Sequence, residues 1–154
     1  MLVAVTRRAL SAWRAVAMVF AAACMLPAVA SAAGPTHAEF VRQADFLCTQ
    51  AAAQTKALGT AKTRAQVAEN LRISIFIGQT LRSSTLAIPA PPADRPLIRR
   101  GMAAMANELA ALRRARSALL AGENAAFQAD LRRAKAAHAK AVAAARTLGL
   151  KACT

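Results

Sequence analysis

The residues of this sequence best suited to metal binding are two histidines and two methionines. His37 and His138 are its only histidines, and Met102 and Met105 stand three positions apart. Imidazole and thioether groups suit soft metals and haem iron, so His138 could form such a site with the two methionines. The sequence contains no Cys-x-x-Cys-His motif for covalent haem attachment. Because methionines at helical spacing more often fill a core, we keep this site as an alternative and expect no cofactor.

Enzymatic chemistry finds little support among the other polar residues. No serine lies in a Gly-x-Ser-x-Gly motif, no glycine-rich phosphate loop occurs, and no Cys-x-x-Cys pair is present. No two acids stand at a spacing that general acid–base catalysis would need. The seven acids are Glu39, Asp45, Glu69, Asp94, Glu108, Glu123 and Asp130. We therefore predict a non-enzymatic protein without catalytic residues.

The first 32 residues have the features of an export signal. Three arginines precede an uncharged, alanine-rich run that ends in the small-x-small pattern Ala30-Ser31-Ala32. We predict cleavage after Ala32, so that residues 1–32 are a signal peptide and residues 33–154 form one domain. That domain would be secreted, periplasmic or associated with the cell wall. Lipidation at Cys24 and retention of the run as a membrane anchor stay open as alternatives.

Cleavage after Ala32 would leave two cysteines, Cys48 and Cys153. An even number of cysteines in an exported chain is typical of disulfide bonding. We therefore predict that Cys48 and Cys153 form a disulfide between the beginning and the end of the domain.

Four helices are expected to position these residues. Apolar residues recur with steps of three and four over residues 36–59, 60–84, 94–121 and 124–148. A proline-rich elbow at residues 86–96 separates the second helix from the third. Heptad-like spacing in the last two helices predicts coiled-coil-like packing. Together with the low aromatic content of 4%, the pattern predicts an all-α fold, an antiparallel four-helix bundle.

Local signals indicate where these helices begin and end. Capping boxes begin at Thr36 and Thr63, and Asp94 is expected to cap the third helix. Gly122 is the expected end of that helix. Apolar residues alternate over residues 71–77, which would also suit a strand. The flanking residues favour a helix and no second candidate strand exists, so we predict a helix there.

Basic charge is the remaining signal. The formal net charge is +14, and without residues 1–32 it becomes +11, from 18 basic and seven acidic residues. This excess is larger than solubility requires and predicts an anion-binding surface on the third and fourth helices. The candidate residues are Arg99, Arg100, Arg113, Arg114, Arg132, Arg133, Lys135, Lys140 and Arg146.

The partner of such a surface outside the cytoplasm would be a lipid headgroup, a wall polymer or an acidic protein. Export argues against nucleic acid as a biological partner, and so does the scarcity of aromatic residues for base stacking.

Four stretches of the sequence resemble a group of small exported proteins common in high-GC actinobacteria. They are "FVRQADFLCTQAAA", the "L-x-x-P-x-P" elbow, "LLAGENAAFQADLRRA" and the final "LGLKAC". The resemblance implies a helical bundle with a cysteine near each end, positions that Cys48 and Cys153 match. It implies no activity. Many members of the group are lipoproteins, and this chain departs from them because its signal lacks a convincing lipobox.

The sequence thus predicts an exported, non-enzymatic helical bundle that binds an anionic envelope component through a basic face. Two alternatives stay open. One is a soft-metal or haem-binding bundle that uses His138, Met102 and Met105. The other is a structural bundle without a ligand.

Overall fold

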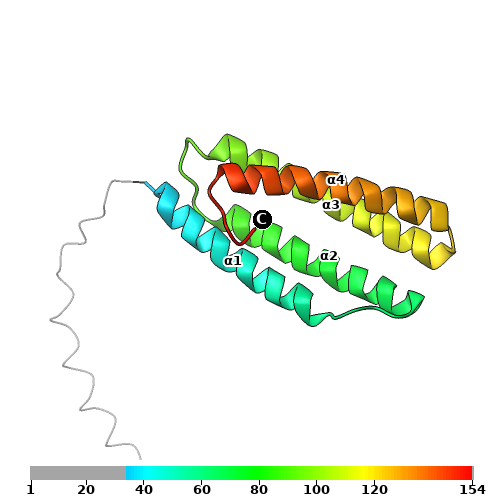
Figure 1. Cartoon of the computed structure of the whole chain (residues 1–154). Coiled ribbons are helices and arrows are strands. Elements are labelled where there is room, and N and C mark those ends of the chain that lie inside the picture. The colour runs from blue at the N-terminus through cyan, green and yellow to red at the C-terminus, as the bar shows by residue number, and fades with distance from the viewer. Residues whose placement is uncertain (1–33, 154) are drawn as a thin grey trace, which may run out of the picture. The chain divides into compact units, whose positions relative to one another are not determined.

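The computed structural model describes residues 34–153, which contain four α-helices and no strand. The helices are α1 (His37–Ala57), α2 (Arg64–Ala87), α3 (Arg95–Ala121) and α4 (Asn124–Thr147), as Figure 1 shows. The predicted all-α fold is confirmed, and each helix ends within four residues of its expected bounds. The predicted cleavage at Ala32, the lipidation alternative at Cys24 and the anchor alternative lie outside the described residues.

The starts of α1 and α2 are fixed by the predicted capping boxes. At the first of them, the Glu39 backbone N–H donates to Thr36 Oγ1 at 3.2 Å, and the Thr36 backbone N–H donates to Glu39 Oε2 at 3.0 Å. Thr63 and Gln66 make the equivalent reciprocal pair before α2. These bonds satisfy backbone donors that a helix start leaves without partners.

The side-chain cap expected from Asp94 at α3 is wrong. Asp94 occupies the N-cap position, but its side chain makes no capping bond. Its Oδ2 lies 2.8 Å from Nδ1 of His37, the first residue of α1. The Asp94 carboxylate therefore pairs with His37 of α1 instead of capping α3 as the local sequence had predicted.

Glycines end the last two helices as expected. Gly122 (φ +84°) and Gly149 (φ +77°) adopt the left-handed conformation, which glycine tolerates best. After Gly149 the backbone N–H of Leu150 donates to the carbonyl of Ala145 at 3.0 Å. This turn returns the chain toward the bundle, so that Leu150 is buried.

The residues that alternate over 71–77 lie inside α2, so the helix prediction is confirmed there. Ile75 and Ile77 are buried, although they are far apart around a helix, while Phe76 between them is exposed. The reason is that α2 packs against both α1 and α3 and so buries a broad face.

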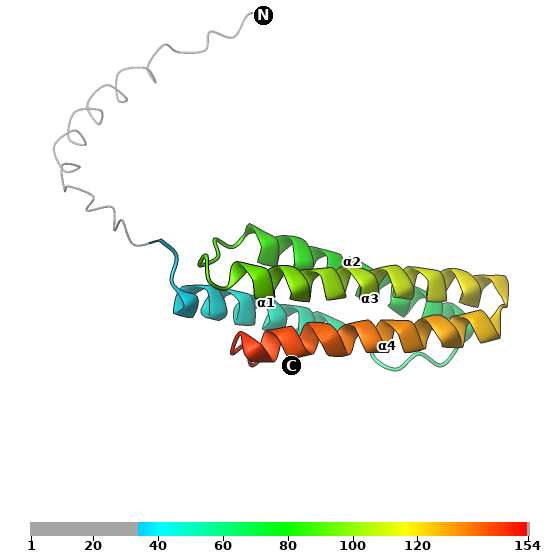
Figure 2. The same cartoon turned by 90° about the horizontal axis from the view of Figure 1, so that it is seen from above.

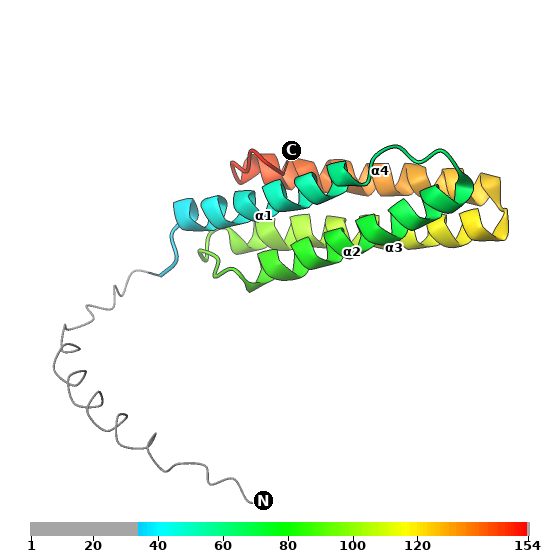
Figure 3. The ribbon, with the colours of Figure 1, turned by 90° about the horizontal axis from the view of Figure 1, so that it is seen from below.

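The helices pack in chain order. Backbones approach within 8 Å between α1 and α2, between α2 and α3, and between α3 and α4, but between no other pair of these four helices. Figures 2 and 3 show the resulting pair of hairpins from above and from below. The backbones of α1 and α4 stay farther apart than 8 Å, and the C-terminal residues after α4 make the covalent and hydrogen-bonded connection to α1.

Two kinds of packing hold the bundle. The α3–α4 pair approaches closely because small residues face each other: a Cβ added at Gly101 would lie 3.2 Å from the Cβ of Ala144. The end of the bundle near the start of α1 has the larger side chains. Its buried cluster consists of Phe40, Ala44, Ile98, Ala145, Leu148 and Leu150.

Candidate functional site

The nine candidate anion-binding residues all lie on α3 and α4, and all nine are exposed. Two of them, Arg114 and Arg133, form ion pairs within the molecule. Arg114 Nε and Arg133 Nη1 lie 3.1 and 2.8 Å from the same Oδ1 of Asp130. The other seven make no ion pair with a carboxylate in the part of the chain that the structure describes.

The basic residues of α4 do not form one face. At about 100° per residue, Arg132, Lys135 and Arg146 lie within about 60° of one another around the helix. Arg133 and Lys140 lie together about 80° or more from that group. We call Arg132, Lys135 and Arg146 the α4 triad, because it is the largest set on one side of this helix.

The acids, in contrast, are used within the fold. Six of the seven accept hydrogen bonds or form ion pairs inside the described residues, and only the side chain of Glu123 does not. The six are Glu39, Asp45, Glu69, Asp94, Glu108 and Asp130. Most of the carboxylates thus have partners of their own, whereas seven of the candidate arginines and lysines have no acidic partner in the described residues.

Asp130 is the clearest of these electrostatic sites. It is buried, and the hydrogen bond from Arg133 is the main reason that its pKa lies below the usual value of 3.8. Desolvation raises the pKa, but the hydrogen bond and positive charge of Arg114 add to the lowering. Asp130 thus stays ionised and holds Arg114 of α3 against α4.

This site predicts an acid-dependent loss of stability. A lowered pKa in the folded state means that the carboxylate stabilises the fold above its unfolded pKa of about 3.9. That contribution is lost as the pH falls through the lower, folded pKa. Asp130→Asn should therefore melt below the parent at pH 6, and the difference should shrink below about pH 4.

Melting curves from pH 2 to pH 7, followed by circular dichroism, measure this effect. Glu123→Gln is the matched control, because the Glu123 side chain has no partner in the described residues. Its melting difference should change little with pH. A melting difference for Asp130→Asn that stays constant from pH 2 to pH 7 would contradict the role of the Asp130 carboxylate.

The three residues of the soft-metal alternative line one cavity inside the bundle. This cavity has a volume of about 380 Å³, and Met102, Met105 and His138 all contribute to its wall. His138 lies at the edge of this cavity, since 60% of its side chain is exposed. No Cα atoms of α1 and α4 lie within 8 Å of each other, so α1 does not cover this part of α4.

Glu108 is a neighbour of His138 that the sequence patterns did not reveal. Its Oε2 lies 3.2 Å from Nδ1 of His138 and it also lines the cavity. A carboxylate that holds one imidazole nitrogen is a common arrangement at metal sites. However, no group of three or more His, Cys, Asp or Glu side chains with metal-binding geometry occurs among residues 34–153. The structure thus places Met102, Met105 and His138 around one cavity. Among the described residues it adds no set of nitrogen, oxygen or thiolate ligands that would complete a metal site there.

The cavity is otherwise apolar and passes between all four helices. Its wall includes Phe40 and Cys48 of α1, Ile77 of α2 and Leu109 of α3. The hydroxyl groups of Thr55 and Ser74 join Glu108 and His138 as its polar groups on one stretch of the wall. A concave, mostly apolar site of this size with a few polar groups is typical of small-molecule sites.

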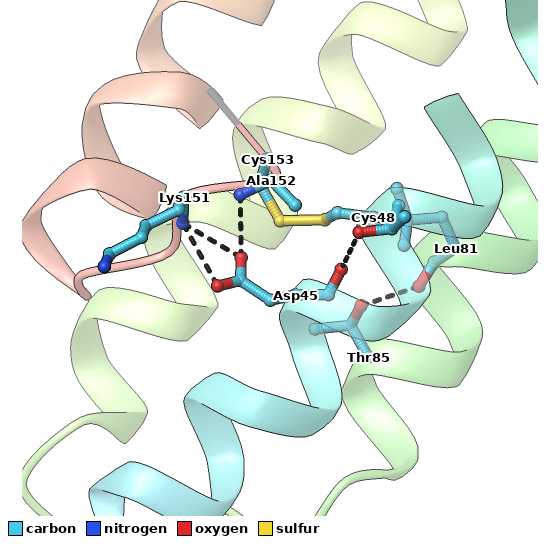
Figure 4. Close-up of a disulfide and its surroundings, with 8 residues drawn as sticks. Asp45, Cys48, Leu81, Thr85, Lys151, Ala152 and Cys153 are labelled. Carbon is cyan, nitrogen blue, oxygen red and sulfur yellow. Dashed lines mark hydrogen bonds between the residues drawn. A yellow bond between two sulfur atoms is a disulfide. The ribbon is translucent and has the colours of Figure 1, made fainter. Parts of the chain in front are cut away.

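The C-terminal segment closes part of the bundle. Cys153 forms the predicted disulfide with Cys48 of α1, with 5.2 Å between their Cα atoms, as Figure 4 shows. One turn earlier on α1, Asp45 Oδ1 accepts the backbone N–H of Lys151 and that of Ala152, each at 2.9 Å. The carboxylate and the disulfide therefore hold the same three-residue segment.

Asp45 is a residue whose role the sequence analysis missed. The signal was present, because Asp45 precedes Cys48 by three positions and residues at that spacing share one side of a helix. What the spacing could not indicate is that the acceptor would bind backbone N–H groups from the far end of the chain.

No helix in the described residues is long and apolar enough to cross a membrane. In comparisons with protein-family models, curated proteins and solved structures, nothing matches this chain.

Proposed function

We propose that this protein is an exported, non-enzymatic binding module whose cationic α3–α4 hairpin associates with an anionic component of the cell envelope. One observation carries the proposal: six of the seven acids have partners within the described residues, while seven of the nine candidate cations have no ion pair there. The resemblance to small exported proteins supports the location and belongs to the proposal.

Electrostatics explain how such a surface works. An exposed cation without an intramolecular partner keeps its full charge available to a ligand, whereas Arg114 and Arg133 would first have to leave Asp130. Each lysine or arginine near an anionic membrane contributes about 1 kcal/mol of binding free energy. Because the residues lie on more than one side of the hairpin, a flexible polymer or a diffuse charged surface suits them better than a small rigid anion.

A binding assay with charge-matched variants tests the proposal. The α4 triad is replaced in Arg132→Gln/Lys135→Gln/Arg146→Gln, and vesicles of anionic lipid and purified anionic wall polymer are the ligands. We expect tight binding by the parent at low salt and at least about a tenfold loss in the triad variant. Binding should also fall steeply as salt is raised, because salt screens exposed charges beyond about 10 Å.

The control removes the same charge elsewhere. Arg42, Lys56 and Lys62 are exposed residues on α1 and the loop that follows it, and their triple replacement by Gln should change the affinity by less than about threefold. The proposal fails if the parent binds neither ligand at low salt. It also fails if both triple variants lose affinity equally, since net charge and not the hairpin would then govern binding.

A further inference from the structure

We propose that the bundle cavity binds one linear hydrocarbon chain whose uncharged, hydroxyl-bearing head group lies at Glu108 and His138. The inference is independent of the cationic surface, because it rests on the shape and polarity of the cavity.

The cavity is elongated. Its wall on α3 extends from Ile98 to Leu112, which corresponds to about 20 Å at the helical rise of 1.5 Å per residue. A volume of about 380 Å³ that is distributed over this length suits one extended chain better than a compact ligand.

One end of the cavity is apolar and covered. Phe40, Ile98, Leu148 and Leu150 lie at this end, and all four are buried. These four side chains offer no hydrogen bond to a ligand. Thr85 also lines the cavity, but it is buried and its hydroxyl donates to the carbonyl of Leu81 at 2.8 Å. The tail of an amphiphile can therefore end here without loss of hydration.

The other end is polar and reaches solvent. The lining residues Ala52 and Thr55 of α1 and His138 of α4 are all exposed, and α1 and α4 have no direct backbone packing. The cavity therefore opens between these two helices. A chain can enter there without separating the closely packed α3–α4 pair.

The polar end offers acceptors to a head group. An ionised carboxylate only accepts hydrogen bonds, so the 3.2 Å contact with Glu108 assigns the ring hydrogen of His138 to Nδ1. In the neutral ring Nε2 is then an acceptor. Thr55 Oγ1 donates its hydrogen to the carbonyl of Ala51 at 2.9 Å and keeps its lone pairs for another donor. Acceptors at this end match a head group that donates, as a hydroxyl does.

The same groups disfavour two charged head groups. An anionic head would lie beside the Glu108 carboxylate, and a quaternary ammonium head has no hydrogen to donate to the acceptors at this end. The chemistry that fits is a single-chain lipid with a hydroxylated, uncharged head, such as a monoacylglycerol.

Calorimetric titration and native mass spectrometry of the full chain, exported and with its disulfide formed, test this inference. The probes share a chain of twelve carbons: monolauroylglycerol, dodecanoate and dodecyltrimethylammonium. We expect one monolauroylglycerol per protein, at least about tenfold tighter than either charged probe. Absence of saturable one-to-one binding by monolauroylglycerol, or equal binding of dodecanoate, would overturn the proposal.

Two leucine substitutions on α4 test whether the ligand binds in the cavity. Ala141 lines the cavity one turn from His138, whereas Ala143 is exposed and does not line it. Ala141→Leu should lower the affinity for monolauroylglycerol at least about tenfold, and Ala143→Leu should leave it within about twofold. Ala52→Leu at the exposed rim repeats the test on α1 without adding volume to the core. Full affinity in a folded Ala141→Leu or Ala52→Leu protein would show that the chain binds elsewhere.

Discussion

Replacement of both cysteines, Cys48→Ala with Cys153→Ala, should lower the free energy of unfolding by about 2–5 kcal/mol. The disulfide spans a sequence separation of 105 residues. For a loop of about 100 residues, the chain-entropy model assigns up to about 4.7 kcal/mol to the restriction of the unfolded chain. The effect should be large in this fold, because no Cα atoms of α1 and α4 lie within 8 Å of each other and no close backbone packing would replace the covalent connection.

Urea denaturation of the parent and the double variant, each with and without reductant, measures the contribution. Reductant should bring the parent close to the double variant and leave the double variant unchanged. The hydrogen bonds from Lys151 and Ala152 to Asp45 remain available after reduction, so the reduced protein should stay folded at low urea. Equal urea midpoints for oxidised and reduced parent would show that the disulfide does not stabilise the fold.

Phe40→Ala should lower the free energy of unfolding by about 3–5 kcal/mol, as large-to-small changes of buried aromatic residues do. The Phe40 side chain is the largest one that is fully buried, with 1% of the residue exposed. It lies in the cluster that joins α1 to Ile98 of α3 and to Leu148 and Leu150 at the end of α4. The cavity left by the missing ring adds to the lost burial of the side chain, which accounts for the size of this effect.

Phe46→Ala is the matched control on the same helix. Phe46 is 61% exposed, so its truncation should change the free energy of unfolding by less than about 1 kcal/mol. For each variant, the shift of the urea midpoint multiplied by a common m value gives the change in the free energy of unfolding. Similar losses in the two variants would contradict the assignment of Phe40 to the core and of Phe46 to the surface.

Local signals in the sequence were sufficient for the helices and their ends. Capping at Thr36 and Thr63 depends on residues three positions away, and termination at Gly122 depends on the conformation of one residue. The disulfide was also predictable, because the predicted cleavage after Ala32 would leave Cys48 and Cys153 as the one possible pair. Such inferences need no knowledge of how distant helices approach each other.

At the candidate sites, contacts between residues far apart in the sequence could not be predicted in this way. Asp94 has the right position to cap α3, but His37 lies 2.8 Å from its carboxylate. Nine basic residues could be named, yet only the fold shows that Arg114 and Arg133 converge on Asp130. Charge counts do not contain this information, because ion pairs between helices depend on their rotation and lateral spacing.

The sequence by itself thus determined the number and limits of the helices, the cysteine pair and the excess of positive charge. These follow from the helical period, from capping over three or four residues, and from composition. Only the tertiary structure decided that the backbones of α1 and α4 stay apart and that Asp45 and Cys48 hold the C-terminal segment. It also decided that an elongated, mostly apolar cavity opens beside Glu108 and His138. The physical reason is that periodicity specifies which face of a helix is apolar. The distance between helices depends on how small and large side chains from all four of them fill the space between.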